Sequence, residues 1–147
     1  MEEIALQFSG LPDKVINSRQ NAHQPGVDHE DIPREMLIIR DLYLLVERRY
    51  KKERSPLYYG KQLGVHLKRL NQLSLEYMGY TIYEYVQQRV HNEAIHLLKH
   101  TILTSKQISY ELGICDPGYF CRCFKKLTGV NPKGFRENHL LSTVSAA

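Results

Sequence analysis

The sequence predicts an all-α protein of about seven helices, in which two helix-turn-helix units are joined by a linker helix. Two observations support this prediction. Apolar residues recur at helical spacing from residue 34 to about residue 138, and a short helix ending at glycine, followed by a longer amphipathic helix, occurs twice about 50 residues apart. The first 33 residues lack this periodicity and predict an irregular N-terminal segment.

Residues 1–33 also differ from the rest in charge. They carry two basic and six acidic side chains, whereas residues 34–147 carry eighteen basic and ten acidic ones. Large apolar side chains at every second position of residues 4–8 indicate one strand, but a lone strand is not stable by itself. We interpret residues 1–33 as a linker or as the remnant of a larger N-terminal domain. The basic remainder is typical of proteins that bind phosphate groups, although many basic surfaces bind none.

Two helices are predicted before the first turn. The first runs from about residue 34 into the charged run 48–54. Its apolar face consists of Met36, Ile39, Leu42, Tyr43, Val46 and Tyr50. Ser55 and Pro56 predict the capped start of a short helix that ends at Gly64. The apolar residues of this short helix are Leu57, Tyr58 and Leu63.

A third helix over about residues 66–78, ended by Gly79, completes the first helix-turn-helix at about residues 56–79. Its inward side carries Leu67, Leu70, Leu73, Ser74 and Tyr77. Its outward side carries Lys68, Arg69, Asn71, Gln72, Leu75 and Glu76. Such a side suits base recognition, because it offers long donors and two amides that can pair with adenine. The alternative is an ordinary solvated helix face.

The linker helix is predicted at about residues 81–100, because Thr81 and Glu84 have the spacing of a capping box. Its apolar residues recur at steps of four: Ile82, Val86, Val90, Ala94 and Leu98. A second capping box, Thr104 with Gln107, opens a short helix that ends at Gly113. This box begins the second helix-turn-helix, at about residues 104–129.

The second long helix is predicted from Asp116–Pro117 to Gly129. Its core side consists of Phe120, Cys123, Phe124 and Leu127. Its outward side consists of Gly118, Arg122, Lys125 and Lys126, while Cys121 points away from the core. Asn131 and Pro132 predict a last short helix. We expect residues 139–147 to form a flexible tail.

Roughly residues 36–137, nearly all of the domain predicted over residues 34–138, are similar to the DNA-binding domain of the AraC/XylS family of bacterial transcription regulators. The resemblance is carried by a specific series of spacings in the second half: Ile108, Leu112, Gly113, Ile114, Asp116, Tyr119, Phe120, Arg122, Phe124, Lys125, Lys126, Gly129, Pro132, Phe135 and Arg136. The first half matches more loosely, and it departs at positions that in the family usually hold other residues. These positions are His66 (a small cap), Ser74 (phenylalanine) and Leu75 (lysine). The second half departs in residue type at three positions, where the family usually has alanine (Ser109), phenylalanine (Ile114) and serine (Gly118).

The resemblance implies that two recognition helices enter successive major-groove segments on one face of a duplex. Within it, Lys68, Asn71 and Gln72 match base-facing positions. The DNA-binding residues that we expect are Lys68, Arg69, Asn71, Gln72, Gly118, Cys121, Arg122, Lys125 and Lys126. The second helix has few strong donors near its start, so we expect the first helix to carry most of the sequence preference. A solvated basic stripe is the alternative for the two lysines.

Other classes of function find little support. No GxSxG, HExxH, P-loop or GxGxxG motif occurs, and the three cysteines form no CxxC pair, so we expect no enzyme, no metal site and no cofactor. No apolar run is long enough for a membrane span, and no signal peptide is visible, so we expect a cytoplasmic protein. The expected partners are double-stranded DNA and RNA polymerase, with oligomerisation through a domain absent from this chain. The alternative function is a helical protein-interaction module that has lost DNA binding.

Overall fold

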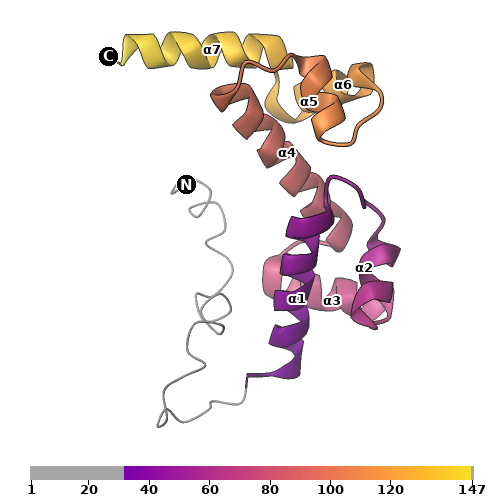
Figure 1. The fold of residues 1–147 in the computed structure, drawn as a ribbon. Coiled ribbons are helices and arrows are strands. Elements are labelled where there is room, and N and C mark those ends of the chain that lie inside the picture. Colours follow the sequence, from indigo (N-terminus) through magenta and orange to yellow (C-terminus); the bar gives the residue numbers. More distant parts are fainter. Residues whose placement is uncertain (1–31, 147) are drawn as a thin grey trace, which may run out of the picture. The chain divides into compact units, whose positions relative to one another are not determined.

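The computed structural model describes residues 32–146, so the candidate strand at 4–8 and most of the N-terminal segment lie outside the described residues. Within 32–146 the chain forms seven α-helices and no strand, which confirms the all-α prediction (Figure 1). The described chain divides into two compact units. Unit 1 comprises residues 32–49 and 54–86, and unit 2 comprises residues 50–53 and 87–146.

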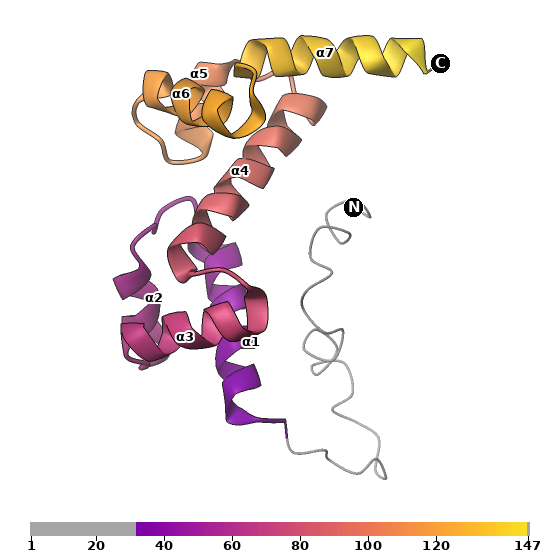
Figure 2. The ribbon, with the colours of Figure 1, turned by 180° about the vertical axis from the view of Figure 1, so that it is seen from behind.

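Unit 1 is built from α1 (Arg34–Arg49), α2 (Pro56–Leu63), α3 (Leu67–Met78) and the beginning of α4 (Ile82–His100). Figures 1 and 2 show α1 packed beside both α2 and α3. Its buried apolar residues are Ile39, Leu42, Val46, Tyr59, Leu70, Leu73, Ile82, Tyr85 and Val86. The rings of Tyr43 and Tyr85 stack at 6.5 Å and link α1 to α4 within this core.

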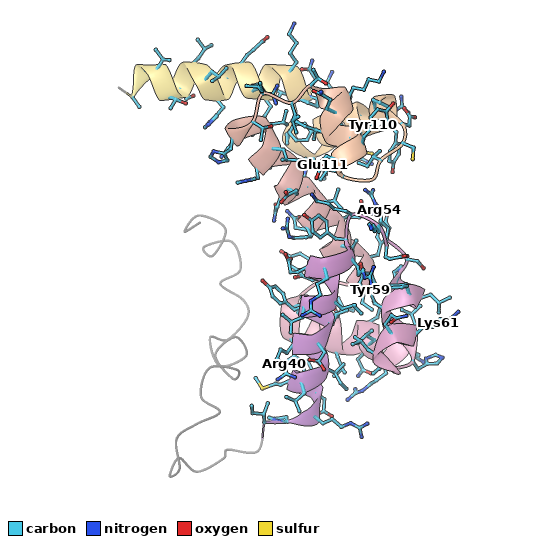
Figure 3. All side chains as sticks on the ribbon, in the orientation of Figure 1. Arg40, Arg54, Tyr59, Lys61, Tyr110 and Glu111 are labelled. Atoms are coloured by element: carbon cyan, nitrogen blue, oxygen red, sulfur yellow. The ribbon has the colours of Figure 1, made fainter. Side chains whose placement is uncertain are left out.

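The structure corrects two expectations for α2. Of the apolar residues predicted for this helix, Leu57 is 51% exposed and Tyr58 and Leu63 are half-buried, whereas Tyr59 (labelled in Figure 3), which the prediction omits, is fully buried. Gly60, also buried, allows α2 to lie close to the following turn, because a Cβ there would lie 3.0 Å from the Val65 carbonyl oxygen. Ser55 occupies the N-cap position as predicted, but its side chain makes no capping hydrogen bond, and Pro56 alone marks the start.

The turn between α2 and α3 ends the first helix at a left-handed glycine. Gly64 has φ +64°, and the next amide, that of Val65, donates to the Gly60 carbonyl at 3.0 Å. This pairing uses carbonyls that the end of a helix would otherwise leave without donors. His66 then caps α3, since its Nδ1 accepts from the Lys68 amide at 3.3 Å.

Unit 2 is built from most of α4, α5 (Ser105–Glu111), α6 (Pro117–Thr128) and α7 (Pro132–Ser145). Its buried apolar residues are Tyr50, Val90, Ala94, Leu98, Ile108, Leu112, Phe120 and Phe124. Phe124 meets Phe135 of α7 edge to face at 5.4 Å. The predicted step-of-four stripe of α4 is therefore buried throughout, shared between the two units.

Two predictions for unit 2 were wrong. Leu127, placed on the core side of α6, is 66% exposed, because the buried side of α6 runs at steps of four from Phe120 through Phe124 to the half-buried Thr128, and Leu127 lies beside it. The last helix is also longer than predicted: α7 continues through the expected tail to Ser145. The hydroxyls of Ser142 and Thr143 donate back to the carbonyls of Asn138 and His139, and no glycine or proline follows Gly134 to end the helix.

Candidate nucleic-acid interface

The outward side of α3 in unit 1 is exposed as the helical spacing predicts. Its exposed residues are Lys68, Arg69, Gln72, Leu75 and Glu76. Arg69 Nη2 lies 3.5 Å from Glu35 Oε1 of α1, and both side chains remain about half exposed. An ion pair this exposed contributes little to stability, so the guanidinium can exchange Glu35 for another anion at small cost.

Asn71 lies at the edge of this outward side and is half-buried. Its Oδ1 accepts a hydrogen bond from the Ile82 backbone N–H at 3.0 Å, at the first residue of α4. The buried Ser74 hydroxyl donates to the Tyr80 carbonyl at 2.6 Å. Sequence periodicity places Asn71 with the outward residues and gives no sign of this contact, because the acceptor role depends on where α4 begins in space.

The second long helix of unit 2 is α6, and Asp116 caps it. Asp116 Oδ1 accepts from the Gly118 amide at 2.8 Å, and Pro117 occupies the first turn. Of the predicted contact residues on α6, Cys121 is half-buried and the others are exposed: Gly118, Arg122, Lys125 and Lys126.

Arg122 lies close to the carboxylate of Asp116, a residue that the sequence predicts only as the cap of α6. Arg122 Nη2 lies 3.6 Å from Asp116 Oδ2, and both side chains are well exposed. A Cβ on Gly118 would meet only the ends of these two side chains, at 3.1 and 3.3 Å. The cap–arginine spacing of six residues is visible in the sequence and is the signal that could have identified the pair.

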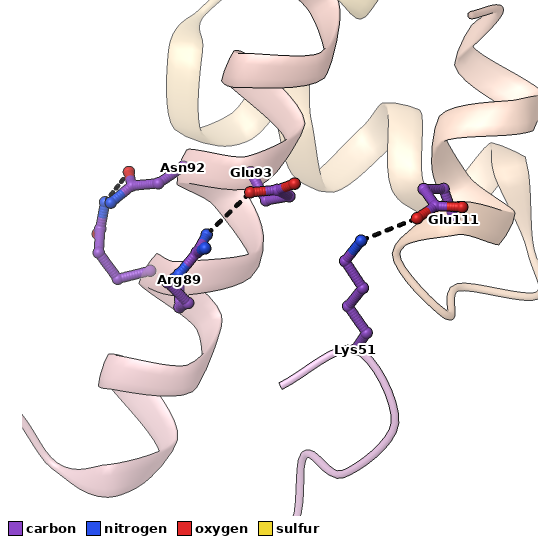
Figure 4. A network of polar contacts seen from close by, with 6 residues as sticks. Lys51, Arg89, Asn92, Glu93 and Glu111 are labelled. Atoms are coloured by element: carbon purple, nitrogen blue, oxygen red, sulfur yellow. Dashed lines mark hydrogen bonds and ion pairs between the residues drawn. The ribbon is translucent and has the colours of Figure 1, made fainter. Parts of the chain in front are cut away.

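The turn before α6 is fastened to the short segment 50–53 within unit 2. Lys51 Nζ lies 2.8 Å from Glu111 Oε1, and this ion pair raises the pKa of Lys51 and lowers the pKa of Glu111 (Figure 4). The guanidinium of Arg89 lies 4.4 Å from the centre of the Tyr50 ring and also pairs with Glu93 at 3.1 Å. These contacts fasten the segment 50–53 to α4 and to the end of α5.

The other end of unit 2 is joined by Arg136 of α7. Its half-buried guanidinium donates to the Leu98 carbonyl at 3.1 Å and to the Leu103 carbonyl at 2.6 Å. The first carbonyl belongs to the last turn of α4 and the second to the loop before α5. Arg136 therefore satisfies one carbonyl that the end of α4 leaves without a donor and one carbonyl of the following loop.

Metal chemistry finds no support in the described part of the chain. Residues 32–146 contain no group of three or more histidine, cysteine, aspartate or glutamate side chains that could hold an ion. The rings of His96 and His100 lie 4.7 Å apart, but within those residues no third ligand accompanies them. The three cysteines are free thiols. Among the helices of residues 32–146, none combines the length and apolar character that crossing a bilayer requires.

Two units that each present an exposed polar helix after a glycine turn define a double helix-turn-helix protein. A family model described as a helix-turn-helix domain matches residues 59–138. The chain therefore belongs to the AraC-type helix-turn-helix family of DNA-binding domains. The family is one of transcription regulators and is not enzymatic.

Two relatives match part of the chain. The chain is 35% identical over 68 residues to the HTH-type transcriptional activator RhaR of Cronobacter sakazakii, covering 46% of the chain and 24% of that protein. It is 25% identical over 103 residues to histidine kinase P4 of Formosa agariphila, covering 69% of the chain and 8% of the kinase. The chain thus spans less than a quarter of the length of these relatives.

The fold is shared with a solved transcriptional regulator from Chromobacterium violaceum, described as a protein with an AraC-type DNA-binding domain. The two chains superpose with a TM-score of 0.63 at 20% identity, over 70% of this chain and 92% of that one. At this identity the likeness concerns the fold.

Proposed function

We propose that this chain regulates transcription by binding a specific DNA sequence, with α3 and α6 in two successive major-groove segments of one duplex. The observation that carries the proposal is the pair of recognition helices, each capped, each preceded by a left-handed glycine and each exposing polar or basic side chains. Such helices are the elements that helix-turn-helix proteins insert into the major groove.

In unit 1 the proposed base contacts come from Lys68 and Gln72. They lie four residues apart and are exposed on the same side of α3. A glutamine amide can pair bidentately with adenine, and a lysine can donate to guanine. Arg69, held weakly by Glu35, is suited to a backbone phosphate.

In unit 2 the proposed contacts come from Arg122, with Lys125 and Lys126 as phosphate anchors. The residues nearest the start of α6 are Pro117 and Gly118, which offer no side-chain donor. We therefore assign most of the sequence preference to unit 1 and mainly positioning on the duplex to unit 2.

The linker helix supports a bipartite mode. α4 has 19 residues, which makes it about 28 Å long at about 1.5 Å per residue. Successive major-groove segments on one face of DNA are about 34 Å apart. A linker helix of this length, together with the widths of the two recognition helices, is sufficient to span the distance between two such groove segments.

Binding to bacterial DNA would place this function in the cytoplasm. RNA polymerase is the further partner that we propose, since the relative with 35% identity is a transcriptional activator. Oligomerisation, if the chain belongs to a longer regulator, would come from a domain outside it.

Selection of bound duplexes from random DNA tests the proposal. We expect two short motifs separated by about one helical turn, and we expect an insertion of about five base pairs between them to weaken binding strongly because it places them on opposite faces. Gln72→Ala should relax the choice of base at one position by about 1–3 kcal/mol, while Lys125→Ala should weaken all sequences alike. Enrichment of a single motif that tolerates any insertion would contradict the bipartite mode.

A further inference from the structure

Two side chains of α3 hold the beginning of α4 within unit 1. Asn71 Oδ1 accepts from the Ile82 amide at 3.0 Å, and the Ser74 hydroxyl donates to the Tyr80 carbonyl at 2.6 Å. Residues three apart share one side of a helix, so the two bonds act on the same short segment. We name Asn71 and Ser74 the α3–α4 latch.

The Ile82 amide is one of those that the start of a helix leaves without an internal acceptor. The Thr81–Glu84 capping box satisfies two neighbouring amides: Glu84 Oε2 accepts from the Thr81 amide at 2.8 Å, and Thr81 Oγ1 accepts from the Glu84 amide at 3.2 Å. The box does not reach the amide of Ile82, whose side chain is fully buried. Asn71 supplies the missing acceptor.

This contact directs the amide group of Asn71 toward the start of α4, which disfavours a bidentate pair with a base. In a bidentate pair with adenine, an asparagine oxygen accepts from the base while its NH₂ group donates. Here the oxygen accepts from Ile82, and the side chain is half-buried at the edge of the outward side. Lys68 and Gln72, by contrast, are both exposed.

We propose that Asn71 is a positioning residue, which sets the orientation of α3 on the start of α4, and that base choice in unit 1 is made by Lys68 and Gln72. This inference rests on the proposed DNA-binding function. It replaces the expectation that Asn71 itself contacts a base. In the first helix-turn-helix, base contacts would then come from two residues only, Lys68 and Gln72.

Three variants of the full chain test it: Asn71→Ala, Asn71→Asp and, as a matched control, Gln72→Ala. Aspartate keeps an acceptor oxygen for the Ile82 amide but removes the NH₂ donor that adenine needs. In Asn71→Ala we expect Ile82 amide hydrogen exchange to become at least about tenfold faster, because its hydrogen bond is lost. In Asn71→Asp and Gln72→Ala we expect the exchange rate of the wild-type chain.

Selection from random duplexes supplies the second readout. Asn71→Asp should bind all duplexes more weakly, through added negative charge, yet select the wild-type sequence. Asn71→Ala should lose preference across the whole unit 1 motif, whereas Gln72→Ala should lose it at one base pair.

Two results would overturn the proposal. One is an unchanged Ile82 exchange rate in Asn71→Ala, and the other is loss of preference at a single base pair in Asn71→Asp. If the wild-type chain selects no sequence, the DNA-binding function and the assigned base contacts are overturned. The exchange rates would still test whether Asn71 holds the start of α4.

Discussion

Lys51 Nζ and Glu111 Oε1 lie 2.8 Å apart and join positions 60 residues apart in the sequence (Figure 4). Lys51 belongs to the segment that follows α1, and Glu111 is the last residue of α5. Two residues further on, Gly113 approaches the Lys51 carbonyl so closely that a Cβ would overlap it. The segment 50–53 is therefore an integral part of unit 2 and supports the turn that leads into α6.

Gly113→Ala should destabilise unit 2 by more than about 2 kcal/mol. The new Cβ would meet backbone that cannot move aside, and φ of +72° is itself unfavourable for alanine. Thermal or urea unfolding of the purified variant measures the loss. Gly129→Ala is the matched control, because Gly129 has φ +82° but no atom within 4 Å of the place that a Cβ would take, so only about 1 kcal/mol should be lost there. Equal losses of unfolding free energy in the two variants would argue against the close contact between Gly113 and the Lys51 carbonyl.

Arg136→Met should lower the free energy of unfolding by about 1.5–3 kcal/mol, because two carbonyls lose a charged donor. Urea unfolding followed by circular dichroism provides the measurement. Lys133→Met is the control on the same helix, since Lys133 is 85% exposed and its pair with Glu137 spans 4.0 Å. The prediction fails if both variants unfold at the urea concentration of the wild-type chain.

Stability should fall as the solution becomes mildly acidic because of His91. Burial lowers the pKa of His91 from its ordinary 6.5, and its ring lies 5.5 Å from that of Phe124. Below pH 6.5 the unfolded chain takes up a proton that the folded chain resists, so stability decreases until the pH reaches the lower folded pKa. His91→Leu should flatten this part of a plot of Tm against pH. A slope in His91→Leu equal to that of the wild-type chain would refute the assignment.

Asp116→Asn should raise the affinity for DNA at low salt several-fold. Asparagine preserves the cap of α6 and removes the carboxylate that faces Arg122 at 3.6 Å. In the proposed binding mode this surface approaches phosphates, which a carboxylate repels. Titration of a labelled duplex measures the gain. Asp116→Ala separates the two roles, because it removes the charge and the cap together and should also lower Tm. An unchanged affinity in Asp116→Asn would show that α6 does not approach the phosphates.

The helices of this fold could be predicted from the sequence because their signals are local. The capping boxes at Thr81 and Thr104 and the left-handed glycines 64, 79 and 129 lie where the periodicity expects them. Burial at the ends of helices could not be predicted. Tyr59 is buried and Leu127 exposed because neighbouring helices decide how far the core extends, and a helical wheel holds no such information.

For the candidate interface, too, the exposed residues could be predicted from the sequence, but the contacts between distant residues could not. Exposure of Lys68, Gln72, Arg122, Lys125 and Lys126 follows from helical spacing alone. The contacts that hold α3 and the end of α5 to other segments do not follow from spacing, since each joins groups that are distant in the sequence or belong to different helices: Asn71 with Ile82, and Lys51 with Glu111.

The salt dependence of duplex binding by the purified chain is the decisive measurement for the proposed function. We predict that the logarithm of the binding constant falls linearly with the logarithm of salt concentration, and that Lys125→Ala reduces the slope by about one. A chain that remains helical by circular dichroism but binds no duplex at low salt would contradict DNA binding and would favour a helical protein-interaction module.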